Sequence, residues 1–499
     1  MFRKNVWTFQ SQQHLHSQLR TSKRLKMLSN KRTLADSVPK EEKTLIQTLS
    51  VDSITQFKNL INSNSEYDIL QGLNGFRKLL LGTQPPLIEI YQSGVLPRLS
   101  QLISGEISIK NLAVGITASM AAIDNPQIID EFIQLGIAKQ YADILCSQFK
   151  LKFLNIFEQA ANGIGNIMGS SPYYRDICLS YGFFNSFLRL CDRFLSLRTD
   201  PTMPTALCHV IMNITSGNPK CDERFAYVLM PYVIKMGQGF EGDTSLYMLQ
   251  TMVNLSEFNI ELVCRMVHSN EVMEFLTGIM NMRYGDFQKF VLQFISNCHD
   301  KYPDTYNYIS NLYESTINVC WQASNSIIIQ MFSFINSVLI TPKYTESAIQ
   351  IIRNNERFIS FLITSTANQN VEAAFFSIEV MNFILMTKKH DFNLIQEFQR
   401  KGIIIHVLSA LTRPSVQEKP NIVSDLLDII IICMSFEINN ESNNMVGENF
   451  DFSPIQDFEE KDGKEVIDTI CLLLPEFDNK VNTIKQIVFS KRNDVSNHL

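Results

Sequence analysis

Residues 158–172 read Glu-Gln-Ala-Ala-Asn-Gly-Ile-Gly-Asn-Ile-Met-Gly-Ser-Ser-Pro, and this stretch indicates the fold more strongly than any other part of the chain. Its small and apolar residues predict a helix that ends in an asparagine, and Gly-Ser-Ser-Pro predicts a break before a second helix. A lone glycine, Gly182, then separates this second helix from a third. Weaker copies of the same helical unit recur along the chain, so we interpret the protein as a repeat array.

The spacing of two residue types supports this interpretation. Asparagines at expected helix ends follow one another after 47, 41, 43 and 39 residues, at Asn166, Asn213, Asn254, Asn297 and Asn336. Glycines before apolar runs are separated by 42 and 46 residues, at Gly94, Gly136 and Gly182. A repeat of about 40–47 residues built from two or three helices is typical of armadillo and HEAT proteins. We therefore expect an all-α, right-handed superhelical solenoid of about nine or ten armadillo repeats, with function on its groove.

Composition favours a chain that folds over most of its 499 residues, because 45% are hydrophobic and 19% are charged. The ten cysteines lack CxxC spacing and lie mostly in apolar helical stretches, which is typical of reduced, buried thiols. The chain has no uninterrupted run of about 18 apolar residues, so we expect no membrane insertion. We predict a cytoplasmic and nuclear protein.

Charge and composition divide the chain into four segments. Residues 1–40 contain nine basic residues and one acid, a net +8, which leaves −14 for the rest of a chain whose total is −6. We expect a basic, largely disordered arm at 1–45, a solenoid at 46–436, an acidic loop at 437–464, and closing helices with a tail at 465–499. Within the last segment we predict helices near 465–474 and 481–489.

Three stretches resemble the importin-α family of nuclear import adaptors. Residues 76–80 (Phe-Arg-Lys-Leu-Leu), Pro85-Pro86 and 94–99 (Gly-Val-Leu-Pro-Arg-Leu) resemble its first half-repeat. Residues 158–172, with Arg175-Asp176 and Gly182, resemble its second repeat without a gap. Leu19-Arg20, Lys23-Arg24, Leu28 and Lys31-Arg32 align with a basic block of its importin-β-binding arm, although residues 11–16 replace an earlier arginine run. The resemblance covers roughly residues 1–340, and two of the three stretches are specific for this family.

The resemblance implies a peptide-binding groove. In that family, one asparagine per repeat bonds the backbone of an extended peptide, and tryptophans one helical turn earlier form slots for lysine stems. This chain keeps most of the asparagines, but its first repeat has Ala118. The tryptophan positions hold Val114, Asn162, His209, Gln250, Gln293 and Phe332. Glu257 matches an acid of the groove. The candidate groove residues are Asn166, Asn213, Asn254, Asn297, Asn336, Glu257, Asn162, His209, Gln250 and Phe332.

One apparent match lies outside the repeat period. Trp321 precedes Asn325 by four residues, as the family motif requires. Asn325 follows Asn297 by only 28 residues, however, whereas Asn336 keeps the period. We interpret Trp321 as part of a second helix.

The resemblance further implies a shuttling transport adaptor that is not an enzyme. Arg20, Lys23, Arg24, Lys31 and Arg32 would bind an importin-β-like carrier, and the groove would bind cargo proteins with extended basic or divergent signal peptides. A recycling exportin is a further implied partner. Because the groove tryptophans are missing, we predict altered cargo recognition. We expect no cofactor, no metal and no direct nucleic-acid binding.

Several alternatives remain open from the residues alone. The periodic asparagines could cap helix ends, and His209 could be a hydrogen-bonded side chain or a metal ligand. The arm could instead tether nucleic acid, although it offers few aromatic residues for stacking beyond Trp7 and Phe9. The whole chain could be a non-transport armadillo scaffold that binds another partner. An enzyme is disfavoured, because no Walker, GxSxG or HExxH motif occurs.

Overall fold

A computed structural model of the chain describes residues 53–81, 85–123, 125–197, 202–239, 242–281, 285–319, 325–442 and 453–497. The predicted arm at 1–45 and Trp321 lie outside these residues. The chain forms two compact units, Met1–Leu255 and Ser256–Leu499. In the described parts of both units all regular secondary structure is helical, as the sequence predicts.

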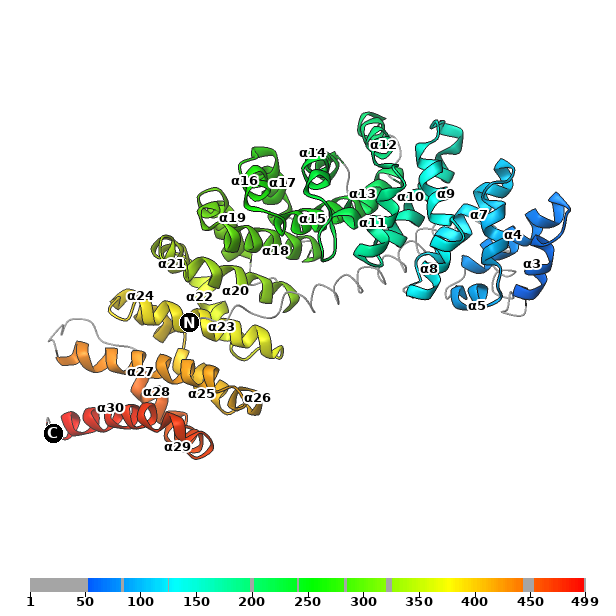
Figure 1. Cartoon of the computed structure of the whole chain (residues 1–499). Coiled ribbons are helices and arrows are strands. Elements are labelled where there is room, and N and C mark those ends of the chain that lie inside the picture. The colour runs from blue at the N-terminus through cyan, green and yellow to red at the C-terminus, as the bar shows by residue number, and fades with distance from the viewer. Residues whose placement is uncertain are drawn as a thin grey trace, which may run out of the picture. The chain divides into compact units, whose positions relative to one another are not determined.

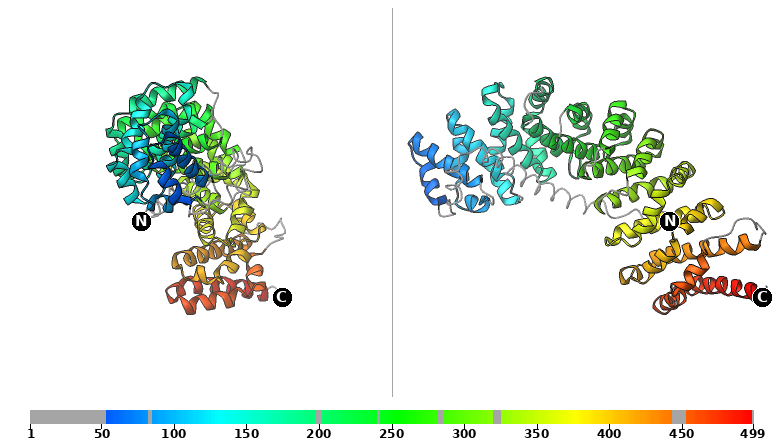
Figure 2. Two further views of the ribbon diagram at one scale, coloured as in Figure 1. Left: turned by 90° about the vertical axis from the view of Figure 1, so that its right-hand side faces the viewer. Right: turned by 180° about the vertical axis from the view of Figure 1, so that it is seen from behind.

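Helices of the first unit follow one another in chain order and lie side by side (Figures 1 and 2). They are α3 (Ser53–Ile61), α4 (Glu66–Leu80), α5 (Leu87–Gln92), α6 (Leu96–Leu102), α7 (Ile107–Met120), α8 (Pro126–Gln134), α9 (Ile137–Cys146), α10 (Leu154–Met168), α11 (Pro172–Ser180), α12 (Phe184–Leu197), α13 (Thr202–Thr215), α14 (Glu223–Gly239) and α15 (Asp243–Ser256), whose last residue begins the second unit. A short 3-10 helix, η1 (Leu151–Phe153), precedes α10.

Helices of the second unit continue the same pattern. They are α16 (Ile260–Val267), α17 (Asn270–Asn281), α18 (Gly285–Lys301), α19 (Tyr306–Val319), α20 (Asn325–Leu339), α21 (Thr345–Arg353), α22 (Glu356–Ser365), α23 (Val371–Thr387), α24 (Phe392–Arg400), α25 (Ile403–Leu411), α26 (Pro414–Gln417), α27 (Pro420–Ser442), α28 (Pro454–Glu460), α29 (Gly463–Leu473) and α30 (Asp478–Asn497). The 3-10 helices η2 (Pro303–Thr305) and η4 (Pro475–Phe477) precede α19 and α30.

Each repeat ends in a long helix, which we call its third helix. The described third helices are α4, α7, α10, α13, α15, α18, α20, α23, α27 and α30. Within the first unit α4, α7, α10 and α13 pack in succession, and within the second unit α18, α20, α23, α27 and α30 do the same. Their side chains include much of the buried core. The fold is an all-α solenoid of stacked helical repeats, as predicted.

Prolines mark repeat starts because they occupy the first turn of a helix, where no backbone N–H is needed. Ser171 accepts a hydrogen bond from the Tyr174 amide, and Pro172 follows it directly. Asn125 and Ser453 cap α8 and α28 in the same way, before Pro126 and Pro454. The sequence break at Gly-Ser-Ser-Pro is therefore a helix cap joined to a helix start.

The periodic glycines separate the first and second helices of their repeats. Gly94, Gly136 and Gly182 have φ values of 74°, 72° and 75°, and Gly402 occupies the same place with 74°. This left-handed conformation is costly for residues with a side chain. The glycine spacing found in the sequence thus marks one recurrent turn.

Residues 437–464 are not the acidic loop that we predicted, as far as they are described. Helix α27 continues to Ser442, and α28 occupies Pro454–Glu460. The Glu437 carboxylate is buried and accepts hydrogen bonds from Ser453 Oγ (2.6 Å) and the Ile455 amide (3.0 Å). These bonds hold α28 against α27, which composition alone could not reveal. The two closing helices are confirmed as α29 and α30.

No helix in the described ranges is both long enough and apolar enough to cross a bilayer.

Candidate functional site

The periodic asparagines lie on successive third helices, close to the C-terminal end of each. Their helices are α10, α13, α15, α18 and α20, in the order Asn166, Asn213, Asn254, Asn297 and Asn336. We call these five residues the asparagine ladder. None of them is a cap residue, because each lies inside its helix. The capping alternative is therefore wrong.

Side-chain amides of the ladder bond the preceding repeat. Asn166 Nδ2 donates to the Ala118 carbonyl (3.2 Å), and Asn213 Nδ2 donates to the Gly165 carbonyl (2.9 Å). Asn254 Nδ2 donates to the Met212 carbonyl and to Thr215 Oγ1, both at 3.2 Å.

In the second unit, Asn297 Nδ2 donates to Ser256 Oγ at 3.0 Å. A carboxamide has two N–H groups and one acceptor oxygen. Each of these asparagines therefore already uses part of its hydrogen-bonding capacity within the solenoid.

Burial divides the ladder into two groups. Asn213 and Asn254 are only 5% and 3% exposed, whereas Asn166, Asn297 and Asn336 are half-buried. The expectation that all five side chains face a groove is therefore not met for Asn213 and Asn254. In this structure they act as hydrogen-bonding groups between repeats.

Two glycines at the C-terminal end of α10, Gly165 and its C-cap Gly169, lie directly against polar side chains of α13. An added Cβ at Gly169 would lie 2.8 Å from Asn213 Oδ1, and one at Gly165 would lie 2.9 Å from His209 Nδ1. Both distances are shorter than real Cβ contacts allow. Because Gly165 in α10 and Gly169 at its C-cap lack side chains, His209 and Asn213 of α13 fit closely against this end of α10.

Most residues at the expected tryptophan positions are also buried. Asn162 and His209 are 9% and 5% exposed, and the His209 ring lies 5.9 Å from that of Tyr247. Gln250 is 3% exposed and donates to Asn254 Oδ1 (3.2 Å), while its own Oε1 has no hydrogen-bond partner within the described chain. These side chains are therefore largely covered by the packing of neighbouring helices.

Phe332 does not line a groove, contrary to the prediction. Its ring is fully buried and contacts Phe361 and Phe358, with centroid distances of 5.8 and 6.4 Å. It belongs to the core of the second unit, because the α20–α22 packing encloses it. Glu257, just beyond α15, is half-buried.

An acidic cluster on α23 and α27 was missed by the sequence analysis. Asp425 accepts a hydrogen bond from Asn382 Nδ2 (2.8 Å), and Asp428 pairs with Lys480 of α30 (2.6 Å). Burial raises the pKa of Asp425 to about 6, and the nearby Asp428 carboxylate adds to the rise. Burial, with the charge of Asp425, also raises the pKa of Glu379. The sequence does contain a sign of this cluster, because two acids lie three residues apart within the apolar run 422–434.

Candidate metal ligands do not gather within the described residues. No group of three or more His, Cys, Asp or Glu side chains is placed to hold an ion there. Burial raises the pKa of the Cys178 and Cys433 thiols to about 12, so both stay protonated near neutral pH. The carrier-binding candidates Arg20, Lys23, Arg24, Lys31 and Arg32 lie outside the described residues.

Comparisons with known proteins give local sequence matches and a wider structural match. The chain is 26% identical over 131 residues to "Probable importin subunit alpha-A" of Dictyostelium discoideum, covering 26% of this chain and 23% of that protein. It is 28% identical over 124 residues to "Importin subunit alpha-2" of Arabidopsis thaliana, covering 23% and 21%. No protein-family model matches.

A solved engineered protein matches much more of the chain. It covers 89% of this chain and 98% of its own, with a TM-score of 0.62 and 13% identity. That match concerns the fold alone. The sequence matches span less than a quarter of each curated relative. This chain is an all-helical repeat protein that is similar to importin α subunits over about a quarter of its length.

Proposed function

We propose that this protein is a nuclear-transport adaptor. It binds an extended cargo peptide along the third helices and an importin-β-like carrier through its basic N-terminal arm. It shuttles between cytoplasm and nucleus, with a recycling exportin as a further partner, and it works without catalysis, cofactor, nucleic-acid binding or membrane insertion. The partial similarity to importin α subunits supports the proposal.

The single observation that carries this proposal is the register of the asparagine ladder. One carboxamide occupies the same part of each of five consecutive third helices. Half-buried Asn166, Asn297 and Asn336 would contact a peptide directly, since each keeps acceptor capacity. Buried Asn213 and Asn254 would contribute by fixing the spacing between helices. Half-buried Glu257 would contact basic residues of the peptide, and buried Asn162, His209 and Gln250 would act from beneath the third-helix surface by shaping it.

Cargo specificity should differ from that of a groove lined by tryptophans. Cation–π and apolar contacts of a lysine stem contribute about 0.5–2 kcal/mol each, so loss of three slots weakens binding about a hundredfold or more. We expect lysine-rich signal peptides to bind more weakly than about 1 µM. Fluorescence anisotropy measures this affinity, and sub-micromolar binding that Asn166→Ala does not weaken would contradict the proposed site.

Carrier capture tests the transport function itself. Immobilised importin-β should retain the full chain, and Lys23→Glu/Arg24→Glu should abolish retention because it reverses the central charges of the basic block. Arg3→Glu/Lys4→Glu makes the same charge change outside that block and should still be retained.

A second function is favoured by the burial of the tryptophan positions. Asn162, His209, Gln250 and Phe332 make the third-helix face unlike a lysine-binding groove. An armadillo scaffold for a different protein partner would have this property. If the wild-type chain does not bind importin-β, the scaffold function replaces the adaptor function.

A further inference from the structure

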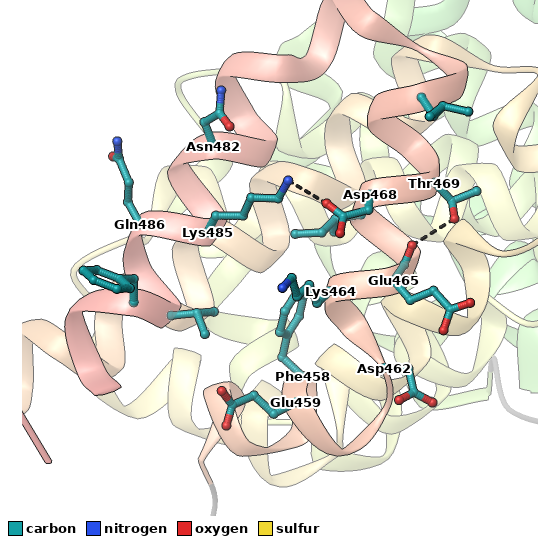
Figure 3. A pocket seen from close by; sticks show the side chains of 14 residues that line it. Phe458, Glu459, Asp462, Lys464, Glu465, Asp468, Thr469, Asn482, Lys485 and Gln486 are labelled. Carbon is teal, nitrogen blue, oxygen red and sulfur yellow. Dashed lines mark hydrogen bonds and ion pairs between the residues drawn. The ribbon is translucent and has the colours of Figure 1, made fainter. Parts of the chain in front are cut away.

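Helices α28, α29 and α30 of the second unit form a pocket of about 1070 Å³ (Figure 3). Close to the connection between α29 and α30, Cys471 Sγ lies 2.7 Å from Asp478 Oδ1. Further along both helices, Lys485 Nζ lies 2.5 Å from Asp468 Oδ1. Because residues further back in α29 contact residues further on in α30, the two helices run antiparallel.

Two large apolar side chains protrude at opposite ends of this pocket. Leu472 is 84% exposed near the end of α29, and Phe489 is 65% exposed on α30. Both belong to the pocket lining. Since α29 and α30 are antiparallel, the pair formed by Asp468 and Lys485 lies between these two side chains.

This surface combines a hollow with protruding apolar side chains. Buried Phe458 and Ile467 line the hollow. Exposed apolar side chains that gather in this way mark a docking surface. In a two-fold contact between identical copies, residue i of one copy meets residue j of the other, and j meets i. Leu472 of each copy can therefore pack against Phe489 of the other copy, beside the hollow.

The charges of this surface also suit a second copy. The Asp468 and Lys485 side chains are 46% and 39% exposed, so solvent and a partner can reach both. A two-fold axis at this pair places Lys485 of each copy opposite Asp468 of the other. The pocket lining also contains Lys464 together with Asp462 and Glu465. A surface of mixed sign can face its own copy, whereas a surface of one sign would repel it.

We propose that two copies of the chain associate through Asp468, Leu472, Lys485 and Phe489, which we call the α29–α30 face. A two-fold axis passes through the pair of Asp468 and Lys485. Leu472 and Phe489 leave water together across this axis, and Lys485 of each copy pairs with Asp468 of the other. The contact uses no residue of the asparagine ladder, so it is separate from the cargo site proposed above.

Sedimentation velocity of the full chain tests this association. We expect the unaltered chain to be dimeric at about 100 µM and to dissociate on dilution. Leu472→Asp/Phe489→Asp should weaken the dimer at least about a hundredfold, because each substitution occurs twice in a two-fold contact. Ile340→Asp/Met386→Asp is the matched control and should leave the dimer unchanged, since these exposed side chains lie outside the pocket lining.

Charge reversal separates loss of the contact from misfolding. Asp468→Lys leaves only lysines at the axis and Lys485→Asp leaves only acids, so each variant alone should be monomeric. A mixture of the two variants should form a dimer, because the lysines of one variant face the acids of the other. Misfolded chains would not recover the contact on mixing.

Three results would overturn the proposal. An unaltered chain that stays monomeric at the highest concentration would leave the α29–α30 face to a different partner. A dimer that survives Leu472→Asp/Phe489→Asp would form through another surface. A mixture of the charge-reversed variants that stays monomeric would exclude the two-fold pairing. Retention by importin-β is measured independently of these outcomes, so the transport proposal is tested separately.

Discussion

Gly163 shows how single residues control the spacing of the repeats. It lies in the middle of α10, and an added Cβ would be 2.5 Å from Tyr141 Cε2. Tyr141 is fully buried, and its hydroxyl donates to Thr117 Oγ1 (2.7 Å). The ring therefore cannot move aside without breaking that bond and opening the core. Glycine in a helix is usually unfavourable, so its presence here reflects close packing.

We predict that Gly163→Ala lowers thermal stability. The overpacking penalty of about 1–3 kcal/mol exceeds the gain in helix propensity of about 1 kcal/mol. Gly278→Ala in α17 is the matched control, because nothing lies within 4 Å of its added Cβ. That substitution should be neutral or stabilising by about 0.5–1 kcal/mol. Differential scanning fluorimetry compares the two melting temperatures, and equal stabilities would contradict the packing argument.

Helix α27 contains two acidic side chains that interact with neighbouring helices of the solenoid. Its acids Asp425 and Asp428 face different partners, since Asn382 of α23 bonds the first and Lys480 of α30 pairs with the second. Asp428 thus has a cationic partner, whereas Asp425 has only an amide. Burial, with the charge of Asp428, raises the pKa of Asp425 to about 6, and the Asn382 hydrogen bond and the charge of Lys480 offset only part of this rise.

The raised pKa of Asp425 predicts a pH dependence of stability. Between about pH 4 and pH 6 the folded state binds more protons than the unfolded state, so stability falls as pH rises through this range. Asp425→Asn removes the ionisation while keeping an oxygen that accepts from Asn382. We expect its stability to exceed that of the wild type by about 1 kcal/mol at pH 7.5, after allowance for solvent screening.

Melting temperatures at pH 4.5 and pH 7.5 provide the measurement. Asp428→Asn is the control, because it breaks the pair with Lys480 and should destabilise at pH 7.5. A lower melting temperature for Asp425→Asn at pH 7.5 would refute the prediction.

At the scale of the whole molecule, each repeat of a solenoid contacts only its neighbours. A substitution that destabilises one repeat should therefore affect only that repeat and its neighbours. Gly163→Ala should accelerate amide exchange in α9, α10 and α13 of the first unit and leave residues 256–499 unchanged. Hydrogen exchange with mass spectrometry resolves these regions. Uniform acceleration in both units would show that the chain opens as one cooperative body.

Much of the architecture could be predicted from local sequence. Helical periodicity, prolines after capping residues and glycines at left-handed turns all act over a few residues, so they predicted the repeats and the closing helices. The same reasoning gave a wrong prediction for the acidic stretch at residues 437–464. Its composition suggested a loop, but Ile455 and Phe458 are buried and Glu437 bonds the start of α28.

The sequence by itself determined that asparagines recur at one position of consecutive repeats and that the basic charge gathers at the N-terminus. Only the tertiary structure decided what the asparagines bond. Asn213 and Asn254 bond backbone carbonyls of the preceding third helix, and Phe332 packs against Phe358 and Phe361 in the core. The burial of these side chains depends on the distances between helices that are about 40 residues apart in the chain. No local sequence pattern specifies these distances.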